Sequence, residues 1–209
     1  MIKLIGFYDY TIILTYTSLL SAIIGMTNAT KGNFTIAIIC LAISGICDAF
    51  DGMVARSKKN RTKDEKSYGI QLDSLVDVIS FGLFPSMICY YMGVNDTLGI
   101  IFIFLFCFAA VTRLAFFNVL ETARQKKEDG CAKYYRGLPV TTISIIFPVI
   151  YILKNFIRKE TFIICLYVML ITVAFLFVLD FKVKKIDLKK LLKIKWKIHT
   201  KCNKKTLIK

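Results

Sequence analysis

The sequence predicts an all-α, polytopic membrane protein with six transmembrane helices and a basic cytoplasmic C-terminal tail. Hydrophobic residues make up 56% of the 209 positions, well above their share in ordinary soluble domains. Six apolar runs approach the roughly 20 residues that a helix needs to cross a bilayer. These runs are too long and continuous for the strands of a membrane barrel, so a helical bundle is the expected fold.

The predicted spans lie at positions 10–27, 34–56, 69–92, 97–118, 138–154 and 161–180. The first span resembles a signal peptide, but Asn28-Ala29-Thr30 is a poor cleavage site, so we expect the span to be retained. No internal repeat is visible. Residues 1–185 are therefore predicted to form one transmembrane domain, and residues 186–209 a juxtamembrane tail.

Four aspartates interrupt the second and third apolar runs. Asp48 and Asp51 stand three residues apart and Asp73 and Asp77 four apart, so each pair shares one face of its helix. Ionisable side chains at membrane depth are costly and are usually kept for a function. Four carboxylates converging in low dielectric repel one another, and divalent cations would offset that repulsion. The spacing therefore predicts a metal site between two membrane helices, with oxygen ligands that suit Mg²⁺ or Mn²⁺.

Small residues share the helical faces of the aspartates. Gly52 and Ala55 follow the first pair, and Gly69 precedes the second pair by one turn. Their small size would let a ligand approach the backbone. In the alternative interpretation, the aspartates pair with basic side chains only to hold the bundle together. That alternative is disfavoured because Arg56 is the only cation within the helical parts of this pattern.

This arrangement resembles the signature of the CDP-alcohol phosphatidyltransferases, membrane enzymes that displace CMP from a CDP-linked lipid with an alcohol. The family pattern is Asp, two residues, Asp-Gly, two residues, Ala-Arg, a loop, then Gly, three residues, Asp, three residues and Asp. Every fixed position is present, although twelve residues separate Arg56 from Gly69 where the family usually has about eight. We interpret the polar insertion, Ser57–Tyr68, as a longer surface connection.

The resemblance implies a role for each matching residue. Asp48, Asp51 and Asp73 match the family's main ligands for two Mg²⁺ or Mn²⁺ ions. Asp77 matches the residue that also touches metal and takes the proton of the incoming hydroxyl. Arg56 would contact the diphosphate and stabilise the departing CMP. The remaining positions, which would line the cytidine pocket, are Gly52, Ala55 and Gly69.

Three further segments resemble the phosphatidylserine synthases within this family: Leu72–Pro85, Thr112–Val119 and Tyr134–Pro139. The resemblance implies transfer of a phosphatidyl group from CDP-diacylglycerol to L-serine, and it suggests a homodimer. Arg113 would either bind the serine carboxylate or a phosphate, or pair with one of the aspartates. Asn118 would either hydrogen-bond serine or cap the end of its helix.

Two other functions stay open. Another member of the same family would use a different acceptor alcohol, such as glycerol 3-phosphate or inositol phosphate. A phosphorylated acceptor would demand a richer basic pocket, whereas Arg113 is the one base in the apolar part of the later predicted helices. A metal-ion transporter, a protein of another class, would use the aspartates as a relay, but they cluster near one membrane face.

The distribution of basic residues predicts the orientation. Lysine and arginine are frequent in the connection after Arg56 and in that between Val119 and Gly137, whereas Gly93–Thr97 has none. The positive-inside rule then places both termini and the active site on the cytoplasmic side of the cell membrane.

The C-terminal tail holds most of the net charge of the chain. Phe181–Lys209 carries +11 of the total of +15. Apolar residues interrupt its lysines, as in a helix that lies on anionic membrane lipid. The plainer alternative is a partly disordered tail that only enforces topology. Its position beside the last span argues against nucleic acid as a partner.

Overall fold

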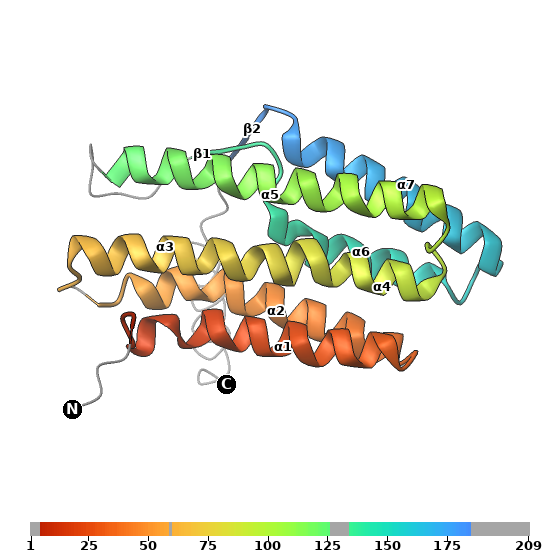
Figure 1. The fold of residues 1–209 in the computed structure, drawn as a ribbon, viewed down its shortest axis with the longest axis horizontal. Helices are drawn as coiled ribbons and strands as arrows, with labels where there is room; N and C mark the ends of the chain where they lie inside the picture. The colour runs from red at the N-terminus through yellow and green to blue at the C-terminus, as the bar shows by residue number, and fades with distance from the viewer. Residues whose placement is uncertain (1–4, 59, 126–133, 185–209) are drawn as a thin grey trace, which may run out of the picture.

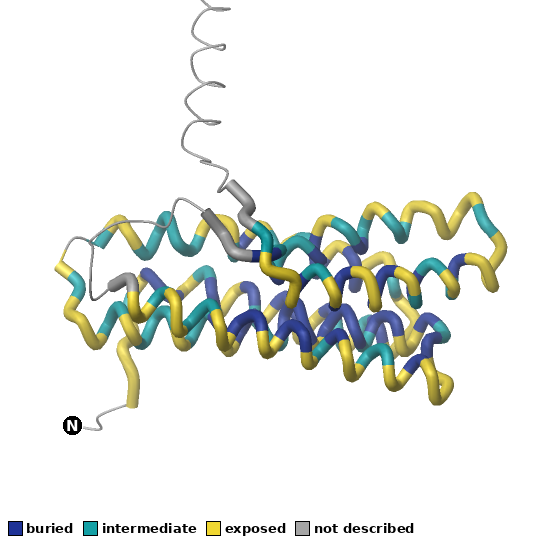
Figure 2. Tube along the Cα trace, turned by 90° about the horizontal axis from the view of Figure 1, so that it is seen from above, coloured by how far each residue is buried: buried dark blue, intermediate teal, exposed yellow. Residues whose placement is uncertain are grey.

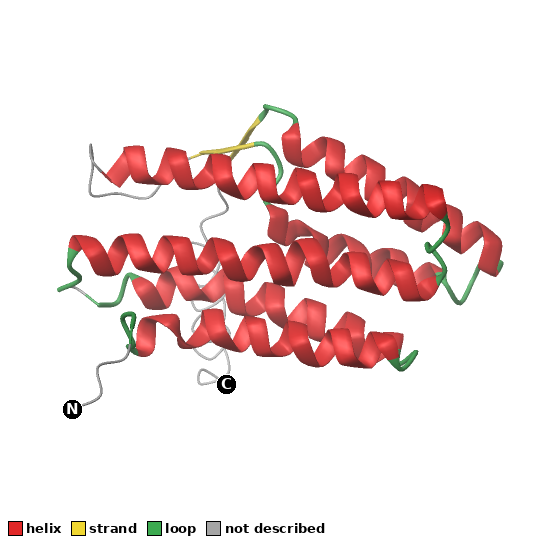
Figure 3. Cartoon of the chain, viewed as in Figure 1, coloured by secondary structure: helices red, strands yellow, loops and turns green. Residues whose placement is uncertain are grey.

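The computed structural model describes residues 5–58, 60–125 and 134–184. Figures 1 and 3 show helices lying side by side with their long axes along one direction of the molecule. Within the described ranges, the exception to an all-helical fold is one small two-stranded antiparallel ribbon. The predicted helical membrane fold is confirmed. The predicted tail, residues 186–209, lies outside the described residues.

The α-helices are α1 (Ile13–Thr30), α2 (Phe34–Ala55), α3 (Lys63–Asp77), α4 (Phe84–Met92), α5 (Thr97–Gln125), α6 (Ile143–Leu153) and α7 (Lys159–Val178). Short turns of 3-10 helix precede two of them, η1 (Tyr10–Ile12) and η3 (Val140–Thr142). A turn of π-helix, η2 (Val78–Leu83), joins α3 and α4 into one continuous rod. The ribbon pairs β1 (Tyr134–Arg136) with β2 (Lys182–Lys184).

Five helical segments of the described residues are long and apolar enough to cross a membrane. The predicted span 138–154 instead contains a shorter apolar segment, built from a 3-residue turn and the 11 residues of α6. At about 1.5 Å per residue such a segment is shorter than the roughly 30 Å of a hydrocarbon core. Figure 1 shows α6 beginning partway along the bundle, so it covers the part farther from the N-terminus.

The rod of α3 and α4 begins at Lys63, earlier than the predicted start at position 69. The Thr62 side chain accepts a hydrogen bond from the Glu65 N–H, and the Glu65 carboxylate accepts one from the Thr62 N–H. This reciprocal capping box stabilises the first turn of a helix. The interpretation of the whole insertion as surface connection was therefore wrong, because positions 63–68 are helical.

The turn η2 follows Asp77 directly and has a local cause. Pro85 has no N–H to give to a carbonyl of the preceding turn. The Phe84 N–H reaches back to the Ile79 carbonyl, and the Ser86 hydroxyl donates to the Gly82 carbonyl at 2.8 Å. Widened turns of this kind are frequent at functional sites.

Close packing of α1 against α2 and α4 depends on small and polar residues. The Ser44 hydroxyl donates to the Ser18 carbonyl at 3.1 Å, and the Ser18 hydroxyl donates to the Ser44 carbonyl at 3.4 Å. A Cβ added to Gly25 would lie 2.1 Å from the ring of Phe84. Such close approach and interhelical hydrogen bonding are what hold helices together in lipid.

Apolar side chains fill the interior and also cover the outer faces. Phe106 of α5 and Phe177 of α7 meet in the core with ring centroids 5.6 Å apart. Figure 2 shows buried residues concentrated along the middle of the bundle and exposed ones on its flanks. Outward side chains such as Phe104, Ile145 and Phe175 are 63%, 67% and 64% exposed. Apolar surface of this extent is suited to contact with lipid.

Candidate active site

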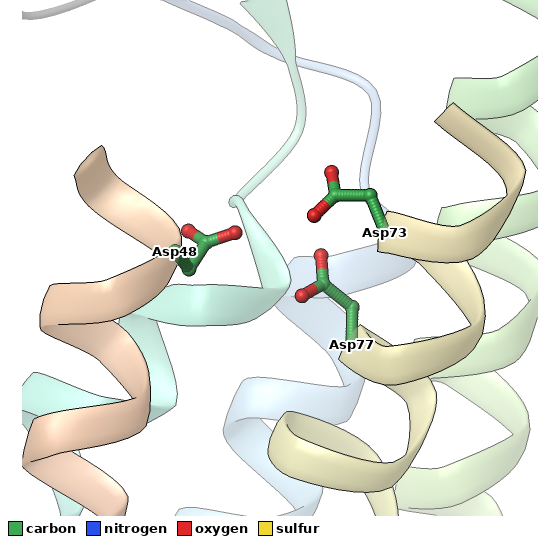
Figure 4. A group of neighbouring side chains, drawn as sticks. All are labelled: Asp48, Asp73 and Asp77. Atoms are coloured by element: carbon green, nitrogen blue, oxygen red, sulfur yellow. The ribbon is translucent and has the colours of Figure 1, made fainter. Parts of the chain in front are cut away.

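Three carboxylates from two helices converge between α2 and α3. Asp48 of α2 and Asp73 and Asp77 of α3 each offer an oxygen, and these oxygens lie within 4.8 Å of one another. Figure 4 shows the three side chains pointing toward the space between the two helices. Asp77 is the deepest, with 7% of its surface exposed, whereas Asp48 and Asp73 are half-buried.

Asp51 lies beside this group without belonging to it. Its Oδ2 accepts a hydrogen bond from the Thr15 hydroxyl of α1 at 3.4 Å. Its carboxyl also interacts with that of Asp73. Asp73 therefore neighbours both the three-carboxylate group and Asp51.

The three-carboxylate group fits a divalent cation. Mg²⁺ and Mn²⁺ prefer hard oxygen ligands, and carboxylates are the oxygen ligands with the most charge to offer. Three ionised carboxylates this close together at membrane depth would repel one another, and a cation between them offsets that repulsion. The donor set on the described helices is therefore suited to metal.

The guanidinium of Arg56 lies over the last turn of α2. A Cβ added to Gly52 would be 3.3 Å from Arg56 Nη1. Arg56 is exposed and follows α2 immediately. The small residue at position 52 thus leaves room for the Arg56 guanidinium beside the carboxylates.

Arg61, in the connection between α2 and α3, is a residue that sequence analysis missed. Its Nη1 donates to the Ala55 carbonyl at 3.4 Å, and its Nη2 donates to the Glu65 carbonyl at 3.0 Å. A Cβ added to Gly69 would be 2.7 Å from Arg61 Nη2. The small residues Ala55 and Gly69, on different helices, therefore both lie next to the Arg61 guanidinium. In the sequence, Arg61 is one of several basic residues in a charged stretch, and nothing local distinguishes it.

An ion-pair network holds the connection that carries Arg61. Lys58 Nζ lies 2.8 Å from Asp9 Oδ2 and 3.0 Å from Glu65 Oε1. The hydrogen bond from Lys58 lowers the pKa of Asp9 from its ordinary 3.8 to about 2. In return, the bond to Asp9 raises the pKa of Lys58. One lysine thus ties the segment before α1 to the beginning of α3.

Arg113 is buried on α5, with 7% of its surface exposed. Its Nε donates to the carbonyl of Leu138 at 3.3 Å. A Cβ added to Gly137 would lie 3.4 Å from the same nitrogen. Arg113 thus links α5 to the segment that enters α6.

Asn118 links α5 to α3. Its Oδ1 accepts a hydrogen bond from the Ser74 hydroxyl at 2.6 Å, and its Nδ2 donates to Gln71 Oε1 at 3.4 Å. The predicted role of Asn118 as a cap at the helix end is wrong, because α5 continues to Gln125. The residue instead fixes the helix that carries Asp73.

Comparison with known proteins agrees with this geometry. The family model described as CDP-alcohol phosphatidyltransferase matches residues 10–180. The chain belongs to the CDP-alcohol phosphatidyltransferase family. The match includes the three-carboxylate group, Asp51 and the connection between α2 and α3.

Several curated proteins resemble this family member. A CDP-diacylglycerol–serine O-phosphatidyltransferase of Saccharomyces cerevisiae is 35% identical over 114 residues, which cover 53% of this chain and 40% of that protein. The protein of that name from Helicobacter pylori is 29% identical over 150 residues, covering 71% and 59%. An archaetidylserine synthase of Methanothermobacter thermautotrophicus is 33% identical over 131 residues, covering 62% and 49%. The chain thus spans 40 to 59% of the length of these relatives. No solved structure matches it at a significant level.

Proposed function

We propose that this protein transfers the phosphatidyl group of CDP-diacylglycerol to L-serine, forming phosphatidylserine and releasing CMP. The observation that carries the proposal is the meeting of Asp48, Asp73 and Asp77 inside the region matched by the family. The choice of serine is supported by the names of the similar curated proteins. In the reaction, the serine hydroxyl oxygen bonds to the phosphorus that bears diacylglycerol, and the bond from that phosphorus to the CMP oxygen breaks.

Two Mg²⁺ or Mn²⁺ ions would be held by the three-carboxylate group, with Asp51 contributing beside Asp73. When bound, such ions neutralise the diphosphate and orient it for in-line displacement. The half-buried position of Asp48 and Asp73 leaves them accessible to a diphosphate from outside the bundle.

The chain's own residues would then perform the remaining steps. Asp77 accepts the proton of the serine hydroxyl, the role that its position in the family pattern implies. Arg56 contacts the diphosphate and stabilises the negative charge that develops on the departing CMP phosphate. The small positions that leave space for the nucleotide are Gly52, Ala55 and Gly69.

Two residues of α5 would serve the site in different ways. Arg113, which donates to the Leu138 carbonyl through Nε, would bind the serine carboxylate. Asn118, which is engaged by Ser74 and Gln71, would orient α3.

The connections rich in lysine and arginine lie at one end of the bundle. Figure 1 shows the N-terminal segment, the connection between α2 and α3, and the C-terminal end of α5 at one end of the molecule. We assign this end, both termini and the active site to the cytoplasmic side of the cell membrane by the positive-inside rule. The family resemblance suggests a homodimer, and the basic tail suggests contact with anionic lipid.

The deciding experiment offers the purified protein CDP-diacylglycerol and Mn²⁺ with one labelled acceptor at a time: L-serine, glycerol 3-phosphate or inositol phosphate. We expect labelled phosphatidylserine and an equal amount of CMP with L-serine alone. Asp77→Asn protein, prepared in the same way, controls for contaminating host enzymes. Use of a phosphorylated acceptor in place of serine would make the chain a different member of the same family.

A further inference from the structure

We propose that Arg61 binds the nucleotide portion of the CDP-linked substrate. This inference rests on the proposed function and extends it to a residue in the inserted connection, outside the aspartate pattern. Arg61 reaches both helices that form the site. It donates to the Ala55 carbonyl at the end of α2, and its guanidinium occupies the space above Gly69 on α3.

The position of Arg61 along the two helices points to the nucleotide. Ala55 follows Asp51 by one helical turn and Gly69 precedes Asp73 by one turn, about 6 Å along each axis. Asp77 lies a further turn beyond Asp73, in the opposite direction from Gly69. The Arg61 guanidinium thus lies at the outer end of the site, away from Asp77, where we place the serine hydroxyl. The part of the substrate left for the outer end is the water-soluble nucleotide.

The hydrogen bonds of Arg61 leave capacity for a ligand. Nη1 and Nη2 donate to main-chain carbonyls, but the buried Nε has no hydrogen-bond partner among the described residues. A buried donor without a partner is destabilising, so its persistence calls for an explanation. A nucleotide offers phosphate oxygens and a base carbonyl, and the planar fork of arginine matches such acceptors.

The connection around Arg61 is already ordered for this role. Thr62, the next residue, is fixed by its reciprocal hydrogen bonds with Glu65. Lys58 joins the same Glu65 to Asp9. A side chain held near its bound position loses less conformational entropy when a ligand arrives. Glycine at position 69 also leaves this space to the guanidinium, since an added Cβ would lie 2.7 Å from Arg61 Nη2.

The test measures CMP binding by isothermal titration calorimetry in Mg²⁺ buffer, using the full chain in detergent. Wild type is compared with Arg61→Gln, Arg61→Lys and a matched control, Lys63→Gln, which removes one exposed positive charge two residues away. We expect Arg61→Gln to raise the Kd for CMP and the KM for CDP-diacylglycerol about tenfold, with the KM for serine within about twofold. Arg61→Lys should give a smaller rise in Kd, because lysine keeps the charge and loses the fork. Lys63→Gln should match wild type.

Other outcomes would overturn the assignment. Unchanged or tighter CMP binding in a folded Arg61→Gln protein, with wild type active, would sink the role of Arg61 and leave the proposed function standing. If Arg61→Gln does not fold, Arg61→Lys decides in the same way. A wild-type protein that neither binds CMP nor releases it from CDP-diacylglycerol would overturn the proposed function and this inference together.

Discussion

The hydroxyl of Ser74, the residue that follows Asp73 in the sequence, donates a hydrogen bond to Asn118 Oδ1 at 2.6 Å. This bond crosses from α3 to α5, and Ser74 is buried at 5% exposure. Rotation of α3 about its axis decides whether Asp73 and Asp77 face α2. The Ser74–Asn118 bond therefore helps to aim both carboxylates without touching substrate.

Removing either partner of this bond should lower stability and turnover together. Asn118→Ala leaves the buried Ser74 hydroxyl without this acceptor, at a cost of about 1–3 kcal/mol, whereas Ser74→Ala should cost less. The double variant should be less damaging than the sum of the two, because the pair acts as one unit. Thermal unfolding and kcat in detergent measure this, with exposed Thr112→Ala on α5 as control. A rise in the serine KM for Asn118→Ala alone would show instead that Asn118 binds serine.

Chelation should abolish CMP release, and added Mn²⁺ or Mg²⁺ should restore it. The reason is that the three-carboxylate group cannot hold a diphosphate without cations to offset the charge. Asp48→Asn and Asp73→Asn should raise the metal concentration needed for activity. Asp77→Asn should lower kcat by about 100-fold or more, as expected for loss of a proton acceptor. Asp64→Asn, an exposed aspartate on the same helix, is the control. Full activity in chelator would overturn the metal assignment.

Substitution of Arg113 should separate its two possible roles. Arg113→Lys keeps the charge but loses the planar fork, so we expect the serine KM to rise about tenfold while the KM for CDP-diacylglycerol changes little. Steady-state kinetics with each substrate varied in turn provides the measurement. Equal effects on both substrates, with a lower unfolding temperature, would mean that the contact with the Leu138 carbonyl is purely structural.

The membrane fold and the placement of Asp73 and Asp77 on one helical face could be predicted because both depend on local periodicity. Apolar runs mark helices, and spacings of three and four place side chains on one face. The early start of α3 was also readable, since Thr62 and Glu65 form a capping box. The contacts of Arg61 were not readable, because they depend on how the connection folds back over Gly69. The shortness of α6 likewise depends on where the preceding segment enters the bundle.

The Lys58 network should stabilise the protein equally across neutral pH. The pKa of Asp9 is lowered to about 2, so its contribution is complete above the ordinary pKa of 3.8 and is lost as pH falls toward 2. The pKa of Lys58 is raised, so its contribution is complete below the ordinary value of 10.5 and is lost only at higher pH. Lys58→Gln should therefore lower the unfolding temperature by a similar amount from about pH 5 to about pH 9. Lys63→Gln is the control, and a decrease that varies across this range would contradict the ion-pair account.

Two truncations should separate the role of the basic tail from that of β2. Removing residues 186–209 leaves β2 and all the site residues in place, so we expect full activity in detergent. Any loss should be confined to anionic-lipid membranes and be greatest at low salt, where charge screening is weakest. Removing residues 181–209 also deletes β2 and the Phe181 carbonyl, which accepts the Gly137 N–H at 2.6 Å. Because Gly137 adjoins the Leu138 carbonyl that binds Arg113, this longer truncation should lose activity even in detergent. A folded protein that lacks only residues 186–209 and is inactive in detergent would show that the tail helps to build the active site.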